Sequence, residues 1–116
     1  GGTTSLTYAV RGGVYTKIGN LVTVSCICMI AVKGSSTGNT TLTGLPFTIN
    51  STDDATGGGA FYANAITYSG MIIILTLKNT TTVSIRQITE LGGDASLTHA
   101  NFANGSDIRI TISYRI

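Results

Sequence analysis

The chain has 116 residues, a length that fits one domain with a hydrophobic core of its own. Only 10% of the residues are charged, 42% are hydrophobic, and the formal net charge is +2. A charge this small and scattered argues against nucleic acid or an anionic membrane surface as a partner. The longest apolar runs, residues 26–32 and 71–75, are far shorter than the ~20 residues that a spanning helix requires, so we expect no membrane insertion.

The chain opens with Gly1-Gly2-Thr3-Thr4 rather than with Met, and no signal-peptide pattern follows. We therefore expect residues 1–116 to form a single β-sandwich domain from a longer polypeptide, with residues 1–6 as a linker. Thr, Ser, Asn and Gly take the place of charged residues on the surface. That composition is typical of β proteins, and also of surfaces that meet other subunits.

The opening stretch predicts strands. Residues 7–11 form a short expected strand, and Gly12-Gly13 is expected to turn the chain into a hairpin with Gly19-Asn20 at its tip. The second strand of this hairpin runs over residues 21–32, and all of its even-numbered positions are apolar. This period of two predicts a strand with one buried face, and its length predicts a bulge or bend.

The middle of the chain continues the pattern. Residues 40–43 predict a short strand with Leu42 inward, and Pro46 predicts an extended bend that places Leu45 and Phe47 in the core. Residues 50–59 have the composition of a loop. A strand over residues 60–68 follows, with one set of side chains on each face. Tyr62, Ile66 and Tyr68 are expected on one face, and Phe61, Ala63 and Ala65 on the other.

The last third predicts three strands and one helical turn. Residues 71–78 and 81–89 read as strands, the second with Val83 and Ile85 inward. The long connection over residues 90–107 is expected to hold one helical turn near residues 97–102, capped by Ser96 or Thr98. The final strand, residues 108–116, alternates apolar and polar side chains. Its apolar face holds Ile108, Ile110, Ile112, Tyr114 and Ile116.

These elements predict an all-β fold, an antiparallel β-sandwich of about eight strands. A jelly-roll order is favoured over an immunoglobulin-like order. Cys26 and Cys28 lie two residues apart on one strand face, too far for a relaxed disulfide, and no histidine accompanies them as a zinc ligand. We interpret both as buried free thiols that pack as small hydrophobic side chains.

Three stretches together resemble the C-terminal tip domains of bacteriophage tail fibres and tailspikes. They are the hairpin at residues 15–22, residues 33–38 ahead of residues 42–47, and Leu97-Thr98 with residues 104–108 ahead of the closing strand that ends in Tyr114. The resemblance spans roughly residues 14–114. It implies a homotrimeric β-sandwich at the distal end of a virion fibre that binds a receptor, trimerises the fibre, or does both. Because the specificity loops of such domains vary freely, the resemblance assigns no binding residue.

The residues give little support for catalysis. His99 lies in a polar connection without the partners of a nucleophilic triad, and five acidic residues leave few pairs for glycoside hydrolysis. Asp53 and Asp54 are adjacent in a Gly-rich loop, where calcium binding is one interpretation and a solvated loop is the other. We therefore expect no enzyme activity, no metal site and no cofactor.

Sugar binding remains open. Aromatic rings hold the C–H faces of sugars, and Tyr62 and Tyr68 flank the Gly-rich loop, while Asp53, Asp54 and Asn64 supply hydrogen-bonding groups. The alternative is that these rings belong to the core. Tyr8 and Tyr15 on the opening hairpin are further ring candidates.

Residues 71–75 are apolar on both faces of the expected strand. If Met71, Ile73 and Leu75 face inward, Ile72 and Ile74 require cover, from a loop or from another subunit. We expect Ile72 and Ile74 at the interface of a homotrimer. The sequence thus leaves three hypotheses: a receptor-binding tip domain for a host-surface glycan or protein, a purely structural trimerisation domain, and a carbohydrate-binding module of a larger enzyme.

Overall fold

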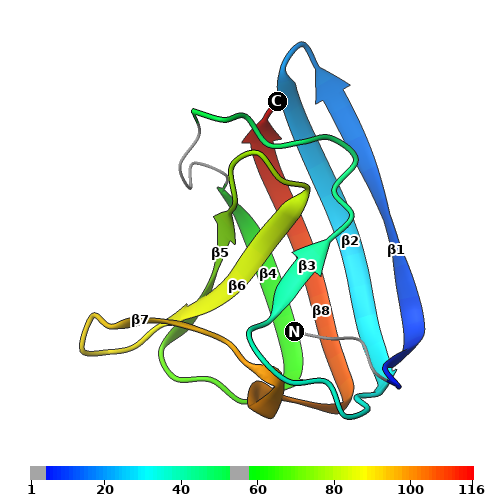
Figure 1. Cartoon of the computed structure of the whole chain (residues 1–116), viewed down its shortest axis with the longest axis vertical. Coiled ribbons are helices and arrows are strands. Elements are labelled where there is room, and N and C mark those ends of the chain that lie inside the picture. The colour runs from blue at the N-terminus through cyan, green and yellow to red at the C-terminus, as the bar shows by residue number, and fades with distance from the viewer. Residues whose placement is uncertain (1–4, 53–57) are drawn as a thin grey trace.

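A computed structural model describes residues 5–52 and 58–116 of the chain, which form eight strands and one short 3-10 helix (Figure 1). The strands are β1 (Thr7–Ile18), β2 (Leu21–Val32), β3 (Thr41–Thr43), β4 (Gly58–Ile66), β5 (Met71–Thr76), β6 (Thr82–Ile88), β7 (Asp94–Ser96) and β8 (Phe102–Arg115), and the 3-10 helix η1 spans His99–Asn101. Residues 5–52 and 58–116 contain no helix that is long and apolar enough to cross a membrane.

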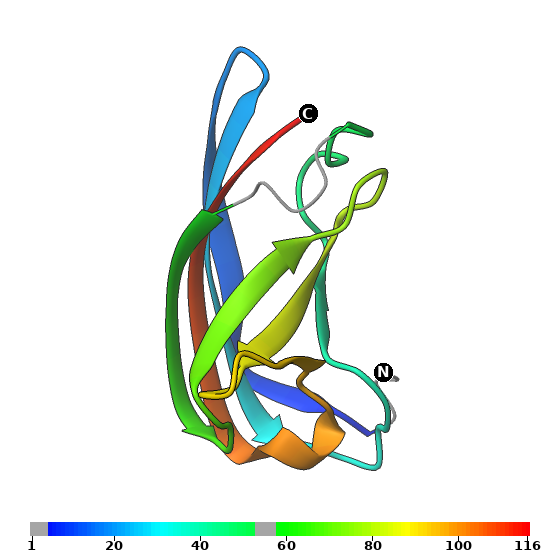
Figure 2. The ribbon, with the colours of Figure 1, turned by 90° about the vertical axis from the view of Figure 1, so that its left-hand side faces the viewer.

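The strands form two antiparallel sheets packed face to face, which Figure 2 shows from the side. The first sheet has the order β1-β2-β8-β4, and the second has the order β3-β6-β5. β7 lies beside the second half of β6, so β3 and β7 share one side of that strand. The predicted all-β sandwich of about eight strands is confirmed, and the chain crosses between the sheets after β2, β3, β4 and β7.

The core lies between the two sheets and is supplied by alternating positions of the long strands. Ile110 and Ile112 on β8 and Val83 and Ile85 on β6 are all at most 2% exposed. Leu45 is buried and Phe47 packs against the core, as the bend at Pro46 predicted. The other buried hydrophobic side chains are Val22, Val24, Ile30, Ile49, Leu97, Phe102, Ile108 and Tyr114.

The opening hairpin forms at the predicted turn but is longer than expected. Ile18 pairs with Leu21 around Gly19, whose φ of +59° suits the first central position of a two-residue hairpin turn. The expected turn at Gly12-Gly13 is wrong, because β1 runs through both glycines. A β-carbon at Gly13 would lie 2.9 Å from the Cys26 β-carbon, so glycine at this position permits close pairing of the two strands.

Bulges decide which side chains face inward. The β1–β2 register shifts next to Tyr8, close to the end of the long strand, which agrees with the bulge predicted from its length. A second shift lies between Asn64 and Ile66 on β4, where Ala65 has a φ of +57°. Ile66 therefore packs against the core while Tyr62 is 52% exposed, so the expectation that they share a face is wrong.

The faces of β5 are the reverse of the expected ones. Ile74 pairs with the buried Ile85 of β6 and therefore points to the core, as does Ile72. Met71, Ile73 and Leu75 occupy the outer face. β5 is apolar on both faces, so its own sequence does not show which face points to the core. Its register with β6 does, because paired residues point to the same side of a sheet and the inward residues of β6 are known. The reason for placing Ile72 and Ile74 at a subunit interface is thereby removed.

The connection between β6 and β8 holds the predicted helical turn. Thr98 precedes η1, and its N–H donates to Asn101 Oδ1 at 2.8 Å, so Thr98 rather than Ser96 begins the turn. The connection is shorter than expected, because β8 begins at Phe102 and β7 occupies residues 94–96. Its course brings His99 beside the loop that precedes β3.

Candidate functional site: a cleft between β1 and β3

The first sheet is wider than the second, and β1 is the strand left without cover. Figure 1 shows β1 at the right-hand edge, beyond β3 and β6. Residues 9–18 of β1 are all exposed, although the inner face of the neighbouring β2 is part of the core. The uncovered inner face of β1 therefore forms one wall of a cleft.

The cleft has a volume of about 660 Å³ and runs between β1, β2 and the segment around β3. Its size falls within the ~300–1,000 Å³ of ordinary ligand pockets. The floor is apolar and includes Val24, Ile30 and Leu45, whereas residues 36–41 supply a wall of polar side chains and backbone groups.

Aromatic and cationic side chains alternate along the inner face of β1. Pairing with the inward residues of β2 places Tyr8, Arg11, Tyr15 and Lys17 on this face. The Arg11 guanidinium carbon lies 4.7 Å from the centre of the Tyr8 ring. Tyr15 meets Phe47 edge to face, with ring centres 5.4 Å apart, and Lys17 Nζ lies 5.2 Å from the centre of the same Phe47 ring. These contacts restrict the side chains before any ligand arrives.

The opposite wall carries neutral hydrogen-bonding groups. The Gly38 N–H donates to His99 Nδ1 at 3.2 Å, which ties η1 to this wall. Ser36 also lines the cleft, and its Oγ is buried without a hydrogen-bond partner among the described residues. An unpaired buried hydroxyl costs about 1–3 kcal/mol, so it calls for an explanation.

Both cysteines line the cleft as half-buried free thiols. Burial raises the pKa of each thiol above its ordinary value. For Cys28 the neighbouring Cys26 adds to the rise in pKa, while Arg11 opposes it. Burial also raises the pKa of Tyr114, whose hydroxyl donates to the Phe47 carbonyl at 3.2 Å.

We expect the domain to lose stability in alkaline solution. These three groups have a higher pKa in the folded chain than in the unfolded chain, so their contribution is complete below the unfolded values, about 8.5 for Cys and about 10 for Tyr. It is lost as the pH rises through the higher folded values. The midpoint of urea denaturation, determined at several pH values between 7 and 10.5, measures this loss of stability. The Cys26→Ala/Cys28→Ala variant should fold and lose less stability between pH 8.5 and pH 10, and an unchanged profile would contradict this account.

The residues selected from the sequence do not form one site. Tyr62 and Asn64 lie on the outer face of β4, away from the cleft, over a shallower depression that includes Tyr62. Arg109 covers Tyr62 at 5.5 Å from the ring centre and forms an ion pair with the buried Asp107, at 3.1 Å. Tyr68 lies in the connection after β4, and Asp53 and Asp54 lie outside the described residues.

Arg11, which lines the cleft, and Lys17, which lies farther along the same face of β1, are residues that the sequence did not indicate. The assumed turn at Gly12-Gly13 separated them into different strands, and the bulge next to Tyr8 shifted the alternation. A continuous strand across both glycines would have placed Arg11, Tyr15 and Lys17 on one face. Tyr8 and Tyr15, the alternative ring candidates, both line the cleft, as does Phe102.

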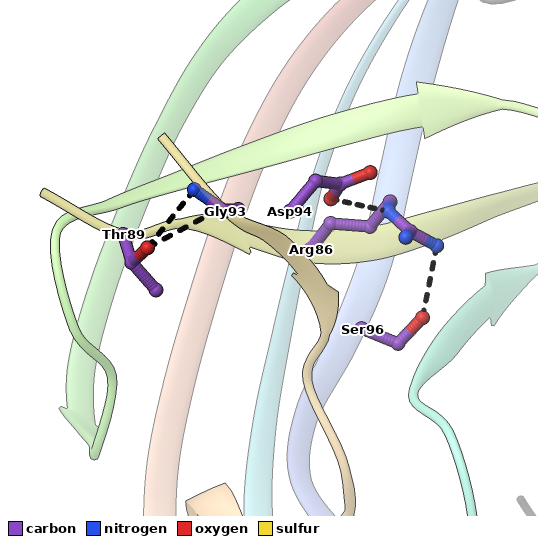
Figure 3. Close-up of polar contacts among 5 residues, drawn as sticks. All are labelled: Arg86, Thr89, Gly93, Asp94 and Ser96. Atoms are coloured by element: carbon purple, nitrogen blue, oxygen red, sulfur yellow. Dashed lines mark hydrogen bonds and ion pairs between the residues drawn. The ribbon is translucent and has the colours of Figure 1, made fainter. Parts of the chain in front are cut away.

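A separate polar cluster holds the β6–β7 hairpin (Figure 3). Arg86 Nε lies 2.7 Å from Asp94 Oδ1, and Arg86 Nη1 donates to Ser96 Oγ at 2.9 Å. At the tip, the Gly93 N–H donates to Thr89 Oγ1 at 3.1 Å. The hydrogen bond and the charge of Arg86 lower the pKa of Asp94. All these contacts are internal to the hairpin, so the cluster fixes a turn rather than forming a site.

Within residues 5–52 and 58–116, no group of three or more His, Cys, Asp or Glu side chains is arranged to hold a metal ion.

Comparisons of the chain with protein-family models, with curated proteins and with solved structures gave no significant match. Any function assigned to this chain therefore depends on its own geometry and on its sequence motifs.

Proposed function

We propose that this chain is a non-enzymatic distal domain of a bacteriophage tail fibre or tailspike, and that it binds a glycan on the host cell surface through the cleft between β1 and β3. The observation that carries the proposal is the uncovered inner face of β1, where aromatic rings face a polar wall. Sugars present both C–H faces and hydroxyl groups, and this cleft offers a surface for each. The resemblance of the three sequence motifs to fibre-tip domains supports the virion location.

The cleft is better suited to binding than to hydrolysis. Glycoside hydrolysis uses two carboxyl groups on opposite sides of the scissile bond. The described residues that line the cleft include no Asp or Glu. His99 accepts a backbone N–H at Nδ1, and no described carboxylate lines the cleft beside it to orient it as a general base.

Competition for host cells tests the proposal. Purified domain, added to bacteria before a phage that carries this chain on its fibre, should reduce phage adsorption in proportion to its concentration. Fluorescently labelled domain should bind the same cells, and surface glycan extracted from them should displace it. Failure of the labelled domain to bind cells that the phage adsorbs to would contradict the proposal.

A structural role in trimerising the fibre is the second candidate function, and the outer face of the β1–β2 hairpin favours it. Val14 and Ile18 are each 73% exposed on this face, and Val10 and Leu21 are 44% and 45% exposed. Ile27 and Met29 continue the same face on β2. An apolar surface of this extent is a common mark of a contact with another chain. A free carbohydrate-binding module, the third hypothesis, is expected to be monomeric.

If this face joins three copies, Val14→Asp should convert a homotrimer to monomers at micromolar concentration. Burying three carboxylates without partners around one axis is unfavourable, whereas the isolated fold tolerates Asp at so exposed a position. Sedimentation velocity measures the result. Leu91→Asp, at a side chain that is 99% exposed on the tip of the β6–β7 hairpin, is the matched control and should leave the trimer intact. A monomeric unmodified domain would contradict trimerisation.

A further inference from the structure

We infer that the ligand of the β1–β3 cleft is a saccharide that carries a negatively charged group, and that Arg11 binds that group. The inference rests on the proposed function and specifies its ligand class. Three features of the cleft support it: the sign of its charge, the position of Arg11, and the exposed ring of Tyr15.

The charge of the cleft has one sign. Among the described residues that line it, Arg11 and Lys33 are cationic and none is acidic. The described acidic side chains lie outside this lining. Glu90 is exposed beyond β6, Asp94 pairs with Arg86 on the β6–β7 hairpin, and Asp107, which contributes to the raised pKa of Cys28, pairs with Arg109. Arg11 forms no ion pair with any described residue. A cleft lined by cations and by no carboxylate attracts anions and holds them more strongly than bulk water does.

Arg11 is held in a position that suits an anionic oxygen pair. It lies opposite Cys28 on the inner face of the hairpin, with its guanidinium carbon 4.7 Å from the centre of the Tyr8 ring. This contact with the ring restricts the guanidinium group and does not use its N–H groups as hydrogen-bond donors. A planar group of this kind binds carboxylate or phosphate oxygens with two parallel hydrogen bonds, which lysine does not reproduce.

The rest of the cleft fits the sugar ring that carries the charge. Tyr15 lies four residues along β1 from Arg11, on the same face, and is 54% exposed, so its ring is open to the C–H face of a pyranose. Its edge-to-face contact with Phe47 holds the ring in place.

Two kinds of acidic saccharide share this chemistry, namely sugars with a carboxylate and sugars with a phosphate. The test therefore uses a printed array of bacterial polysaccharides with three arms: polymers containing uronic or ulosonic acids, phosphate-bearing polymers, and neutral polymers. The purified domain should bind members of one or both acidic arms and none of the neutral arm. The arm that binds identifies the source of the charge. Binding confined to neutral polymers would overturn the inference while leaving the proposed function in place.

Variants then assign the charge to Arg11. Arg11→Gln should weaken binding to an acidic polymer about 10-fold or more, the usual effect of removing a charge-assisted hydrogen bond, and Arg11→Lys should recover only part of the loss. Arg115→Gln removes a cation from the exposed outer face of β8 and should leave binding unchanged. If Arg11→Gln and Arg115→Gln weakened binding of the acidic polymer equally, the inference would be overturned. Binding would then depend on the net charge of the domain rather than on a contact in the cleft.

The two cysteines report where the polymer binds. Cys26 and Cys28 line the cleft, so a bound acidic polymer should slow their alkylation by iodoacetamide at pH 8.5, and a neutral polymer should not. Alkylation that proceeds at the same rate with saturating acidic polymer would place binding elsewhere and overturn the inference. A domain that binds no polymer of any arm and no host cell would contradict the proposed function itself, so the two failures are distinguishable.

Discussion

Replacing Ile112 by alanine should lower the free energy of unfolding by about 2–5 kcal/mol, the range for large-to-small substitutions in a packed core. Ile112 is 1% exposed and lies on β8 between β2 and β4. Its neighbours in the sheet are Val24 on one side and Gly59 on the other. Because Gly59 has no side chain to move into the vacated space, most of the cavity should persist.

Urea denaturation followed by circular dichroism measures this loss. Arg115→Ala is the matched control on the same strand, since Arg115 is exposed on the outer face and its loss should change stability by about 0.5 kcal/mol or less. Equal midpoints for Ile112→Ala and the unmodified domain would mean that β8 presents its other face to the core.

Gly70→Ala should cost about 2–5 kcal/mol, although Gly70 lies in an exposed turn. Gly70 has a φ of +72°, and an L-residue in this conformation loses about 1–2 kcal/mol. A β-carbon there would also overlap the carbonyl oxygen of Ile88, a backbone atom that moves only if the β5–β6 pairing shifts. Overpacking of this kind adds about 1–3 kcal/mol.

Gly92→Ala separates the cost of the strained backbone from the cost of the steric overlap. Gly92 has a φ of +81° with no atom within 4 Å of the added β-carbon, so its substitution carries the backbone strain alone. The midpoint for Gly70→Ala should therefore fall well below that for Gly92→Ala in the same denaturation experiment. Equal losses would show that the β4–β5 turn adjusts without disturbing β6.

The alternation of side chains was enough to predict the two strands that form the centre of the fold. On β2 the even-numbered positions from Val22 to Ile30 are buried or half-buried as predicted, whereas Val32 is 47% exposed. On β8 the predicted apolar face is buried from Ile108 to Tyr114. Alternation fails wherever one residue is inserted, because the side chains beyond it change faces. Ala65 does this on β4 and moves Ile66 to the core. β5 is apolar on both faces, so only its pairing with Ile85 reveals which face is inward.

The cleft was harder to predict than the fold because its walls come from distant parts of the sequence. Arg11 comes from β1, Ser36 and Thr40 come from the connection between β2 and β3, and His99 comes from η1. Nothing local in the sequence relates these residues to one another. The rings chosen first, Tyr62 and Tyr68, were selected because they flank a Gly-rich loop, and the structure places Tyr62 on the opposite face of the sheet.

The strand that is last in the sequence is central in the first sheet. β8 lies between β2 and β4, and in Figure 1 its red ribbon runs between theirs. While the chain is being synthesised, β2 and β4 therefore lack their shared neighbour until residues 102–115 leave the ribosome. A chain that stops before residue 102 exposes two unpaired strand edges and is prone to aggregate, so the first sheet is complete only once β8 has been added.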